Sequence, residues 1–267
     1  MTRHIFYNNG KTAAMAHAEA ILRRIGCRFA SEPGPDVTHL LLDAPSFDAS
    51  GALRGGGDIG ALLPYFDKRI TIVGGNLPDK LHDYHTIDLL QDDLYLAENA
   101  DITAHCALTV ALPNLPVTLK TCPVLVIGWG RIGKCLARLL RRLGADVTVA
   151  ARKSSDRAML TALGYHASTL SSPEKELPTY RIIFNTAPAP IFSKEILAQS
   201  AAKCLKIDLA SIRGLEAEDV IWARGLPNTH APETSGTLIA KTILRLMMKR
   251  SYDHDHRICH VRLILYL

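Results

Sequence analysis

Three glycines follow an apolar run with the spacing of a phosphate-binding loop. Residues 124–127, Val-Leu-Val-Ile, lead directly into G-x-G-x-x-G, and a helical pattern follows. In such a loop the first glycine permits a tight turn, the second leaves room for a pyrophosphate, and the third lets the helix approach the strand. A purely structural turn is the alternative. The residues expected to contact a dinucleotide here are Gly128, Trp129, Gly130, Arg131, Ile132 and Gly133.

The residues after the next apolar run favour NADP over NAD. NAD sites usually carry Asp or Glu about 20 residues after the glycine loop, where it binds the ribose 2′-hydroxyl. Here the run Asp146–Ala150 leads into Arg152, Lys153 and Ser154, and no acidic residue closes it. A guanidinium fork suits a phosphate, so these three residues predict a 2′-phosphate site. An exposed basic loop is the alternative.

Polar residues follow two further apolar runs. Residues 181–184 lead into Asn-Thr-Ala-Pro, and Asp208 lies near the end of residues 205–209. Ligands of open parallel sheets bind outside the carboxyl ends of the strands, so we expect these polar residues near the cofactor. Asn185 and Thr186 are candidates for the nicotinamide ribose, and Asn185 as a turn cap is an equal alternative. The set expected at the cofactor is Asn185, Thr186, Ala187, Pro188 and Asp208.

Short apolar runs alternate with helical patterns in both halves of the chain, which is typical of parallel β-α-β units. The sequence therefore predicts an α/β fold of two doubly wound parallel-sheet lobes, the second being a Rossmann NAD(P)-binding domain. The motif Pro-Asn-Leu-Pro at 113–116 predicts a hinge. The expected segments are 1–95 for the first lobe, 96–120 for a linker helix and hinge, 121–236 for the dinucleotide-binding domain, 237–250 for a C-terminal helix and 251–267 for a tail without an assigned role.

The composition is that of an ordinary globular chain. Of 267 residues, 48% are hydrophobic and 21% charged, and 31 Lys+Arg against 26 Asp+Glu give a net charge of +5. An excess this small, with 6% aromatic residues, argues against a nucleic-acid-binding protein. No window approaches the ~20 apolar residues of a membrane span, and the first residues lack the apolar core of a signal peptide. We therefore expect a cytoplasmic protein.

The cysteines and histidines favour no metal site. No two of the six cysteines form a C-x-x-C pair and no H-E-x-x-H pattern occurs, so no metal is expected. In a reducing compartment the cysteines are expected to be small buried apolar residues. They are Cys27, Cys106, Cys122, Cys135, Cys204 and Cys259.

Four segments together resemble the family formed by the A subunit of dipicolinate synthase. They are residues 124–155, Asn-Thr-Ala-Pro at 185–188, Asp-Leu-Ala-Ser at 208–211, and Gly-Leu-Pro followed by Ala-Pro-Glu-Thr-Ser-Gly within 225–236. Many dehydrogenases share the glycine loop, whereas the last three motifs in this order are more specific. The resemblance implies a flavodoxin-like N-terminal lobe, a Rossmann domain with NADP, and a flavoprotein-like partner, the B subunit of dipicolinate synthase. Together they would oxidise a reduced cyclic dicarboxylate to dipicolinate, the calcium chelator of bacterial endospores.

Two departures from the family pattern lie where the substrate is expected. The family's Pro-Thr-Ala-Glu-Gly is Ile-Thr-Ala-His-Cys at 102–106, so a histidine, His105, replaces the glutamate. The family's Asp-Leu-Ala-Ser-x-Pro-Gly-Gly becomes Asp-Leu-Ala-Ser-Ile-Arg-Gly-Leu at 208–215. The cofactor inference is therefore stronger than the substrate inference.

The implied chemistry needs a proton acceptor and partners for two carboxylates. Neutral histidine accepts protons near pH 7, which makes His105 and His230 the candidates; satisfied or exposed structural histidines are the alternatives. Arg213 and a helix start near Thr234 could hold a carboxylate, although that helix start could equally be an N-cap. The residues expected at the substrate are Thr103, Thr234, Ser235 and Gly236.

Two other functions stay open. One is a 2-hydroxyacid or alanine-type dehydrogenase, which would need an arginine and a Glu-His pair around a carbonyl. The other is a nucleotide-binding partner subunit without its own catalysis, which the replaced glutamate favours. Assembly into a homo-oligomer also stays open.

Overall fold

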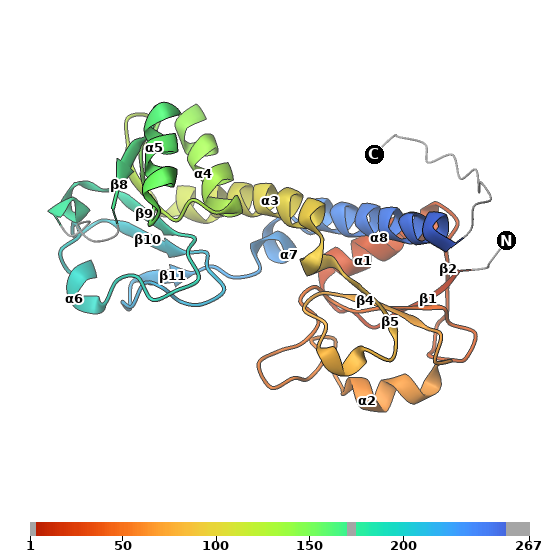
Figure 1. Ribbon diagram of the computed structural model, residues 1–267. Helices are drawn as coiled ribbons and strands as arrows, with labels where there is room; N and C mark the ends of the chain where they lie inside the picture. The colour runs from red at the N-terminus through yellow and green to blue at the C-terminus, as the bar shows by residue number, and fades with distance from the viewer. Residues whose placement is uncertain (1–3, 170–174, 255–267) are drawn as a thin grey trace. The chain divides into compact units, whose positions relative to one another are not determined.

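The computed structural model describes residues 4–169 and 175–254, which fold into two compact units (Figure 1). Unit 1 joins the chain up to Tyr95 with the chain from Glu233 onward, and unit 2 is Leu96–Pro232. Each unit is built on one parallel sheet with helices between the strands. The predicted fold class of two doubly wound parallel-sheet lobes is confirmed.

The chain crosses between the units elsewhere than the sequence predicts. The crossings follow Tyr95 and Pro232, not the predicted hinge at 113–116. Leu119 and Cys122 are buried in the core of unit 2, and Leu115 packs against the same core. These apolar side chains anchor the proline-containing segment to unit 2, so it is a loop of that unit and no hinge.

The sheet of unit 1 has the flavodoxin-like strand order β2-β1-β3-β4-β5. Its topological switch point lies between β1 and β3, on either side of which the chain winds in opposite directions. The sequence patterns missed β2, which has two residues, and β5, whose residues are mostly polar. The strands are β1 (Ile5–Asn8), β2 (Arg28–Phe29), β3 (His39–Leu41), β4 (Thr71–Gly74) and β5 (His85–Asp88).

Two long helices pack against each other in unit 1. α1 (Ala13–Arg24) is capped by the Thr12 hydroxyl, which accepts from the Met15 N–H. α8 (Pro232–His254) comes from the far end of the described chain. A Cβ at Gly236 would lie 2.4 Å from the Ala14 carbonyl oxygen, so the missing side chain is what lets the two helices approach. The expected C-terminal helix, 237–250, begins five residues earlier in the structure and extends to His254.

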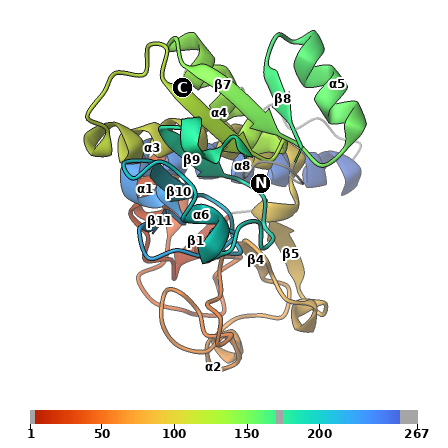
Figure 2. The same ribbon diagram turned by 90° about the vertical axis from the view of Figure 1, so that its left-hand side faces the viewer.

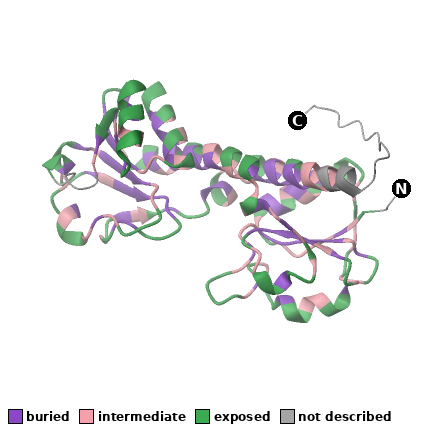
Figure 3. Ribbon diagram, in the orientation of Figure 1, coloured by how far each residue is buried: buried purple, intermediate pink, exposed green. Residues whose placement is uncertain are grey.

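The opposite face of the unit 1 sheet is covered by short helices. Leu40 and Ile72 point into a second apolar cluster with Ile59 and Phe66. Buried strands and exposed outer helix faces alternate in each unit (Figure 3). The short helices of unit 1 are α2 (Ile59–Leu62), η1 (Leu63–Tyr65), η2 (Asp79–Leu81) and η3 (Leu89–Gln91).

The sheet of unit 2 has the strand order β11-β10-β9-β6-β7-β8. Read from β6 as the first strand, this is the Rossmann order 3-2-1-4-5-6, with the switch point between β6 and β9. The register pairs Ile127 with Ala150 on one side and with Asn185 on the other. The strands are β6 (Pro123–Ile127), β7 (Asp146–Ala150), β8 (His166–Ser168), β9 (Ile182–Asn185), β10 (Leu205–Asp208) and β11 (Val220–Trp222).

Helices cover both faces of the unit 2 sheet (Figures 1 and 2). Val124, Val126 and Phe184 face the core under the longer helices, and Leu125, Ile127 and Ile183 face the other core. The helices of unit 2 are α3 (Asp93–Ala111, which unit 2 includes from Leu96), α4 (Arg131–Arg142), α5 (Ser154–Ala162), α6 (Lys194–Leu197), α7 (Leu226–His230), η4 (Leu112–Asn114) and η6 (Leu177–Thr179). Among the described residues, no helix is long and apolar enough to cross a bilayer.

Candidate functional site

The glycine loop joins β6 to α4 at the switch point of the unit 2 sheet. Gly128 has φ +103°, a left-handed conformation that L side chains rarely adopt, and a Cβ there would lie 2.6 Å from Thr186 Oγ1. A Cβ at Gly133 would lie 2.1 Å from the Gly128 carbonyl oxygen. Protein packing therefore demands glycine at both positions.

Gly130 differs from the other two glycines. A Cβ placed on it meets no protein atom within 4 Å, and its φ of −81° and ψ of −169° suit any residue. Gly130 is also the N-cap of α4 and contributes no side-chain hydrogen bond to the helix start. Neither the backbone nor the packing of the protein explains a glycine here, whereas a pyrophosphate in contact with the backbone would.

The other loop residues surround this open position. The Trp129 ring lies edge-on to Tyr165 with centroids 5.8 Å apart, and Lys134 Nζ is 5.7 Å from the Trp129 ring. Ile132 packs against the apolar core, and Arg131 is exposed. Trp129 therefore ties the loop to the segment after α5 and could report on its occupancy by fluorescence.

The chain after β9 forms the second wall of the switch point. Thr186 Oγ1 donates to the Ile127 carbonyl at 2.9 Å, which joins the end of β9 to the start of the glycine loop. Ala187 is half-buried and Pro188 exposed beyond it. The structure thus brings Thr186 beside the glycine loop, as the strand order requires.

Asn185 and Asp208 take a role other than the expected one. Both are fully buried, and Asn185 Nδ2 donates to Asp208 Oδ1 at 3.0 Å. The Asn185 amide also exchanges hydrogen bonds with both backbone groups of Ala187. Asp208 accepts three further backbone N–H groups, from Ala210, Gly214 and Leu215. These side chains shape the loops after β9 and β10, and their polar atoms are not presented to a ligand.

The basic turn after β7 is held by an arginine that the sequence patterns missed. Arg152 and Lys153 are exposed, and Ser154 begins α5 instead of lying in the loop. Nη1 of Arg157 donates to the carbonyls of Ala151 and Arg152, at 2.9 and 2.7 Å. The role of Arg157 could have been predicted from one signal, which is an arginine in the first turn of a helix that follows a basic loop.

The predicted histidines both lie on the surface of unit 2. His105 projects from α3 with 62% of its side chain exposed, and its Nε2 is 3.8 Å from Asp101 Oδ2. His230 ends α7 and is exposed, with Nδ1 3.3 Å from Thr109 Oγ1. Burial raises the pKa of the Cys106 thiol beside His105, which keeps that thiol neutral at physiological pH.

Several expected substrate ligands are engaged within the protein. The Thr103 hydroxyl donates to the Asn99 carbonyl of its own helix at 2.7 Å. Thr234, Ser235 and Gly236 lie inside the first turns of α8, so neither hydroxyl residue is its N-cap. Ser235 is 2% exposed, and Gly236 packs against α1. Of these four residues only Thr234 is exposed.

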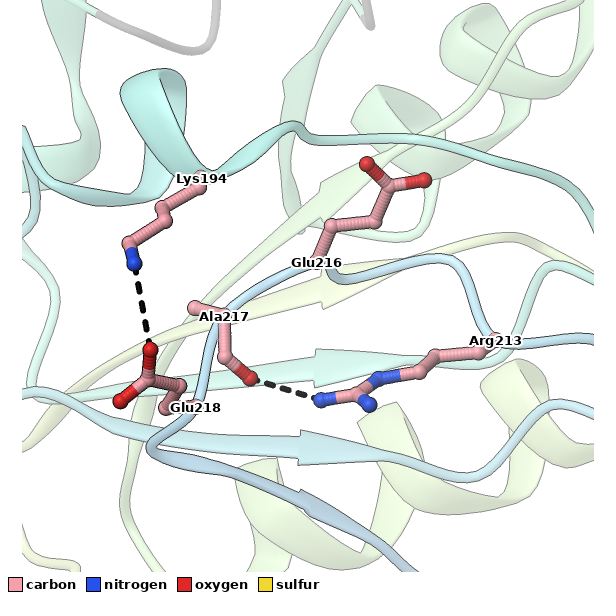
Figure 4. Close-up of a pocket in the computed structure, with 5 residues that line it drawn as sticks. All are labelled: Lys194, Arg213, Glu216, Ala217 and Glu218. Carbon is pink, nitrogen blue, oxygen red and sulfur yellow. Dashed lines mark hydrogen bonds and ion pairs between the residues drawn. The ribbon is translucent and has the colours of Figure 1, made fainter.

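Arg213 lies beside a shallow hollow of unit 2 (Figure 4). Its Nε and Nη2 donate to the carbonyls of Leu215 and Ala217, at 3.1 and 2.6 Å. Lys194 and Glu218 form an ion pair across the same hollow, at 3.2 Å. The guanidinium stabilises its own loop, which weakens its expected role as a partner for a substrate carboxylate.

The described cysteines are small, mostly enclosed side chains. Cys106, Cys122 and Cys204 are buried, Cys27 and Cys135 are half-buried, and all five are free thiols. Burial raises the pKa of Cys204 to about 11. Cys259 lies outside the described residues.

Comparison with known proteins gives one curated relative and many solved structures. The A subunit of dipicolinate synthase from Bacillus subtilis (strain 168) is 30% identical over 172 residues, which cover 60% of this chain and 57% of the relative. The chain is a relative of this dipicolinate synthase protein. No protein-family profile matches the chain.

The solved structures show a likeness in fold. The A subunit of dipicolinate synthase from Bacillus halodurans has a TM-score of 0.80 at 21% identity, covering 92% of this chain and 98% of that one. An L-alanine dehydrogenase has a TM-score of 0.66 at 12% identity, covering 93% and 81%. The chain therefore has the fold that these dehydrogenase and dipicolinate synthase structures share.

Proposed function

We propose that the chain is an NADP-dependent oxidoreductase that oxidises a dihydro- or hydroxytetrahydrodipicolinate to dipicolinate. It would act during sporulation, together with the flavoprotein-like B subunit of dipicolinate synthase. The observation that carries the cofactor part is Gly130, whose missing side chain serves neither backbone nor packing. The substrate part is supported by kinship with the A subunit of dipicolinate synthase over 172 residues.

The chain's own residues would bind and orient the dinucleotide. Backbone N–H groups at the start of α4 would face the pyrophosphate, where the positive end of the helix dipole stabilises an anion. Arg152 and Lys153 would contact the 2′-phosphate, and Arg157 would hold their turn in place. Thr186 would border the nicotinamide side of the loop, and the buried pair Asn185–Asp208 would position that wall.

The reaction requires removal of a hydride and a proton from the dihydro ring, after loss of water where the ring is hydroxylated. NADP, when bound, supplies the hydride acceptor. His105 and His230 are the proposed proton acceptors, because both imidazoles are exposed to solvent and neutral histidine accepts protons near pH 7.

Cofactor choice gives the first test. We expect NADPH to bind at least tenfold more tightly than NADH, a difference of about 1.4 kcal/mol. Arg152→Ala should remove most of this difference by deleting the guanidinium that pairs with the 2′-phosphate, while NADH affinity stays unchanged. Titration calorimetry measures both affinities, with Arg142→Ala at the far end of α4 as a matched control. Equal affinities of the unmutated protein for the two cofactors would contradict the assignment.

The reaction itself is tested by a coupled assay. Purified protein with NADP⁺, substrate and the flavoprotein-like partner should produce dipicolinate, followed by its ultraviolet absorbance, and His105→Gln should slow the rate. The engaged side chains of Thr103 and Arg213 also support a second candidate, a nucleotide-binding subunit without its own catalysis. If the rate is unchanged in His105→Gln and in His230→Gln, neither histidine is the proton acceptor. If NADPH binds but no dipicolinate forms, the second candidate replaces the first.

A further inference from the structure

In the loop after β1 of unit 1, the backbone N–H groups of residues 9–12 all donate to acceptors within the protein. The Asn9 N–H donates to the Leu41 carbonyl, and the Gly10 N–H to Asn8 Oδ1 at 2.9 Å. The N–H groups of Lys11 and Thr12 both donate to the Asp43 carboxylate, at 3.0 and 3.1 Å. An anion therefore finds no free backbone donor here, and any ligand of this loop must be held by side chains.

Asp43 ties this loop to the end of β3, across the switch point. It is 2% exposed and also accepts the Thr12 hydroxyl at 2.7 Å. The carbonyl of Asp43 accepts the Ser46 hydroxyl at 2.7 Å, and the carbonyl of Ser46 accepts the Arg54 N–H at 2.9 Å. A continuous series of hydrogen bonds thus connects the backbone of Lys11 to that of Arg54.

A second contact brings the loop of residues 51–57, which contains Arg54 and four glycines, against the loop after β1. A Cβ at Gly55 would lie 2.0 Å from the Asn9 carbonyl oxygen and 3.3 Å from Asn9 Nδ2. Gly55 must therefore be glycine for the Arg54 loop to rest on Asn9. The two loops form one layer at the carboxyl ends of β1 and β3, where ligands of doubly wound sheets bind.

One buried polar atom in this layer has no hydrogen-bond partner in the part of the chain that the structure describes. Among the described residues, Asn9 Nδ2 is the buried side-chain donor without a hydrogen-bond partner. Such a donor costs about 1–3 kcal/mol when it stays unpaired, and native structures rarely keep one without a purpose. An oxygen atom supplied from outside the chain would satisfy it.

The cations of the layer are not neutralised by neighbouring acids. Lys11 and Arg54 are exposed, and neither has an ion pair among the described residues; Arg54 uses only Nε, on the Phe47 carbonyl at 3.2 Å. The nearby Asp43 is engaged by backbone donors, and Asp48 accepts from Ser50 and Ala52 within its own turn.

From this arrangement we propose that unit 1 carries a carboxylate-binding site made of Asn9, Lys11 and Arg54 at the β1/β3 switch point. The ammonium and guanidinium groups hold the carboxylate, and the Asn9 amide donates to one of its oxygens. The proposal deepens the proposed function and rests on it for the identity of the ligand, which is one carboxylate of the pyridine dicarboxylate. The site itself belongs to unit 1 alone.

The experiment titrates the full chain with dipicolinate, pyruvate and inorganic phosphate by calorimetry. We expect dipicolinate to bind, and Lys11→Ala and Arg54→Ala each to weaken it at least tenfold with NADPH affinity unchanged. Lys68→Ala and Arg24→Ala are the controls, because these exposed cations lie near the amino ends of the strands and should change affinity less than twofold. Asn9→Asp should weaken binding further than Asn9→Ala, since it adds a like charge.

The outcomes separate this site from the proposed function. Dipicolinate binding that is unaffected in both cation variants overturns the site and leaves the proposed function standing. Binding of pyruvate but not dipicolinate, with the same dependence on Lys11 and Arg54, supports the site and contradicts the proposed function. Tighter binding of phosphate than of either carboxylate, or binding of none of the three, overturns the site.

Discussion

Gly130→Val will abolish nucleotide binding and leave the protein as stable as the unmutated chain. The valine methyl groups would occupy the open space beside the backbone, where no protein atom lies within 4 Å, and the φ and ψ of Gly130 are accessible to valine. We expect at least a hundredfold loss of NADPH affinity, about 2.7 kcal/mol, with an unchanged thermal melting curve. Quenching of Trp129 fluorescence and calorimetry measure the binding.

The neighbouring glycine provides the control for this experiment. Gly133→Ala places a Cβ 2.1 Å from the Gly128 carbonyl oxygen, so α4 must move away from β6 and both stability and binding should fall. Normal NADPH affinity in Gly130→Val with an unchanged melting temperature would show that the loop is not the phosphate site.

Asp208→Ala will destabilise unit 2 severely. The substitution leaves the Asn185 amide and the N–H groups of Ala210, Gly214 and Leu215 without their acceptor, in a fully buried place. Each buried donor left unpaired costs about 1–3 kcal/mol, so we expect a loss of roughly 3 kcal/mol or more. Urea unfolding followed by fluorescence of the two tryptophans measures the change.

Two further variants serve as comparisons for the loss of unfolding free energy in Asp208→Ala. Asp208→Asn keeps one acceptor oxygen and should cost less than the alanine variant. Glu218→Ala removes an exposed acid from the surface pair with Lys194 and should change the free energy of unfolding by less than about 1 kcal/mol. A loss for Asp208→Ala no larger than that for Glu218→Ala would mean that the loops keep their shape without the carboxylate.

Local sequence patterns predicted the helices and strands whose apolar residues recur with a clear period or whose ends are marked by glycine. β7 was predicted with its observed bounds, and the helix α4 was predicted directly after the glycine loop, because apolar periodicity marks both. β2 and β11 were missed because two or three residues offer no period. The glycine loop is local in sequence, and it lies between a strand and a helix as its pattern predicts.

What depended on distant contacts could not be predicted from the sequence. Asn185 and Asp208 are polar residues at strand ends, which suggests ligand contact, yet they are separated by 23 positions and bond to each other. Gly236 suggests a helix start, but its absent side chain serves α1, more than 200 residues earlier in the chain. Such pairings become visible only when the strand order and helix packing are known.

Unit 1 is discontinuous in the chain, and this sets an order on its maturation during synthesis. A ribosome delivers β1 to β5 first, then all of unit 2, and α8 last. Until α8 emerges, the face of α1 around Ala14 that Gly236 covers stays open to the surroundings. Unit 2 is contiguous in the chain and can fold as it leaves the exit tunnel. Unit 1 cannot be completed until α8 is synthesised, and it exposes apolar surface until then. A nascent chain stalled before residue 233 therefore lacks the helix that covers this face of α1.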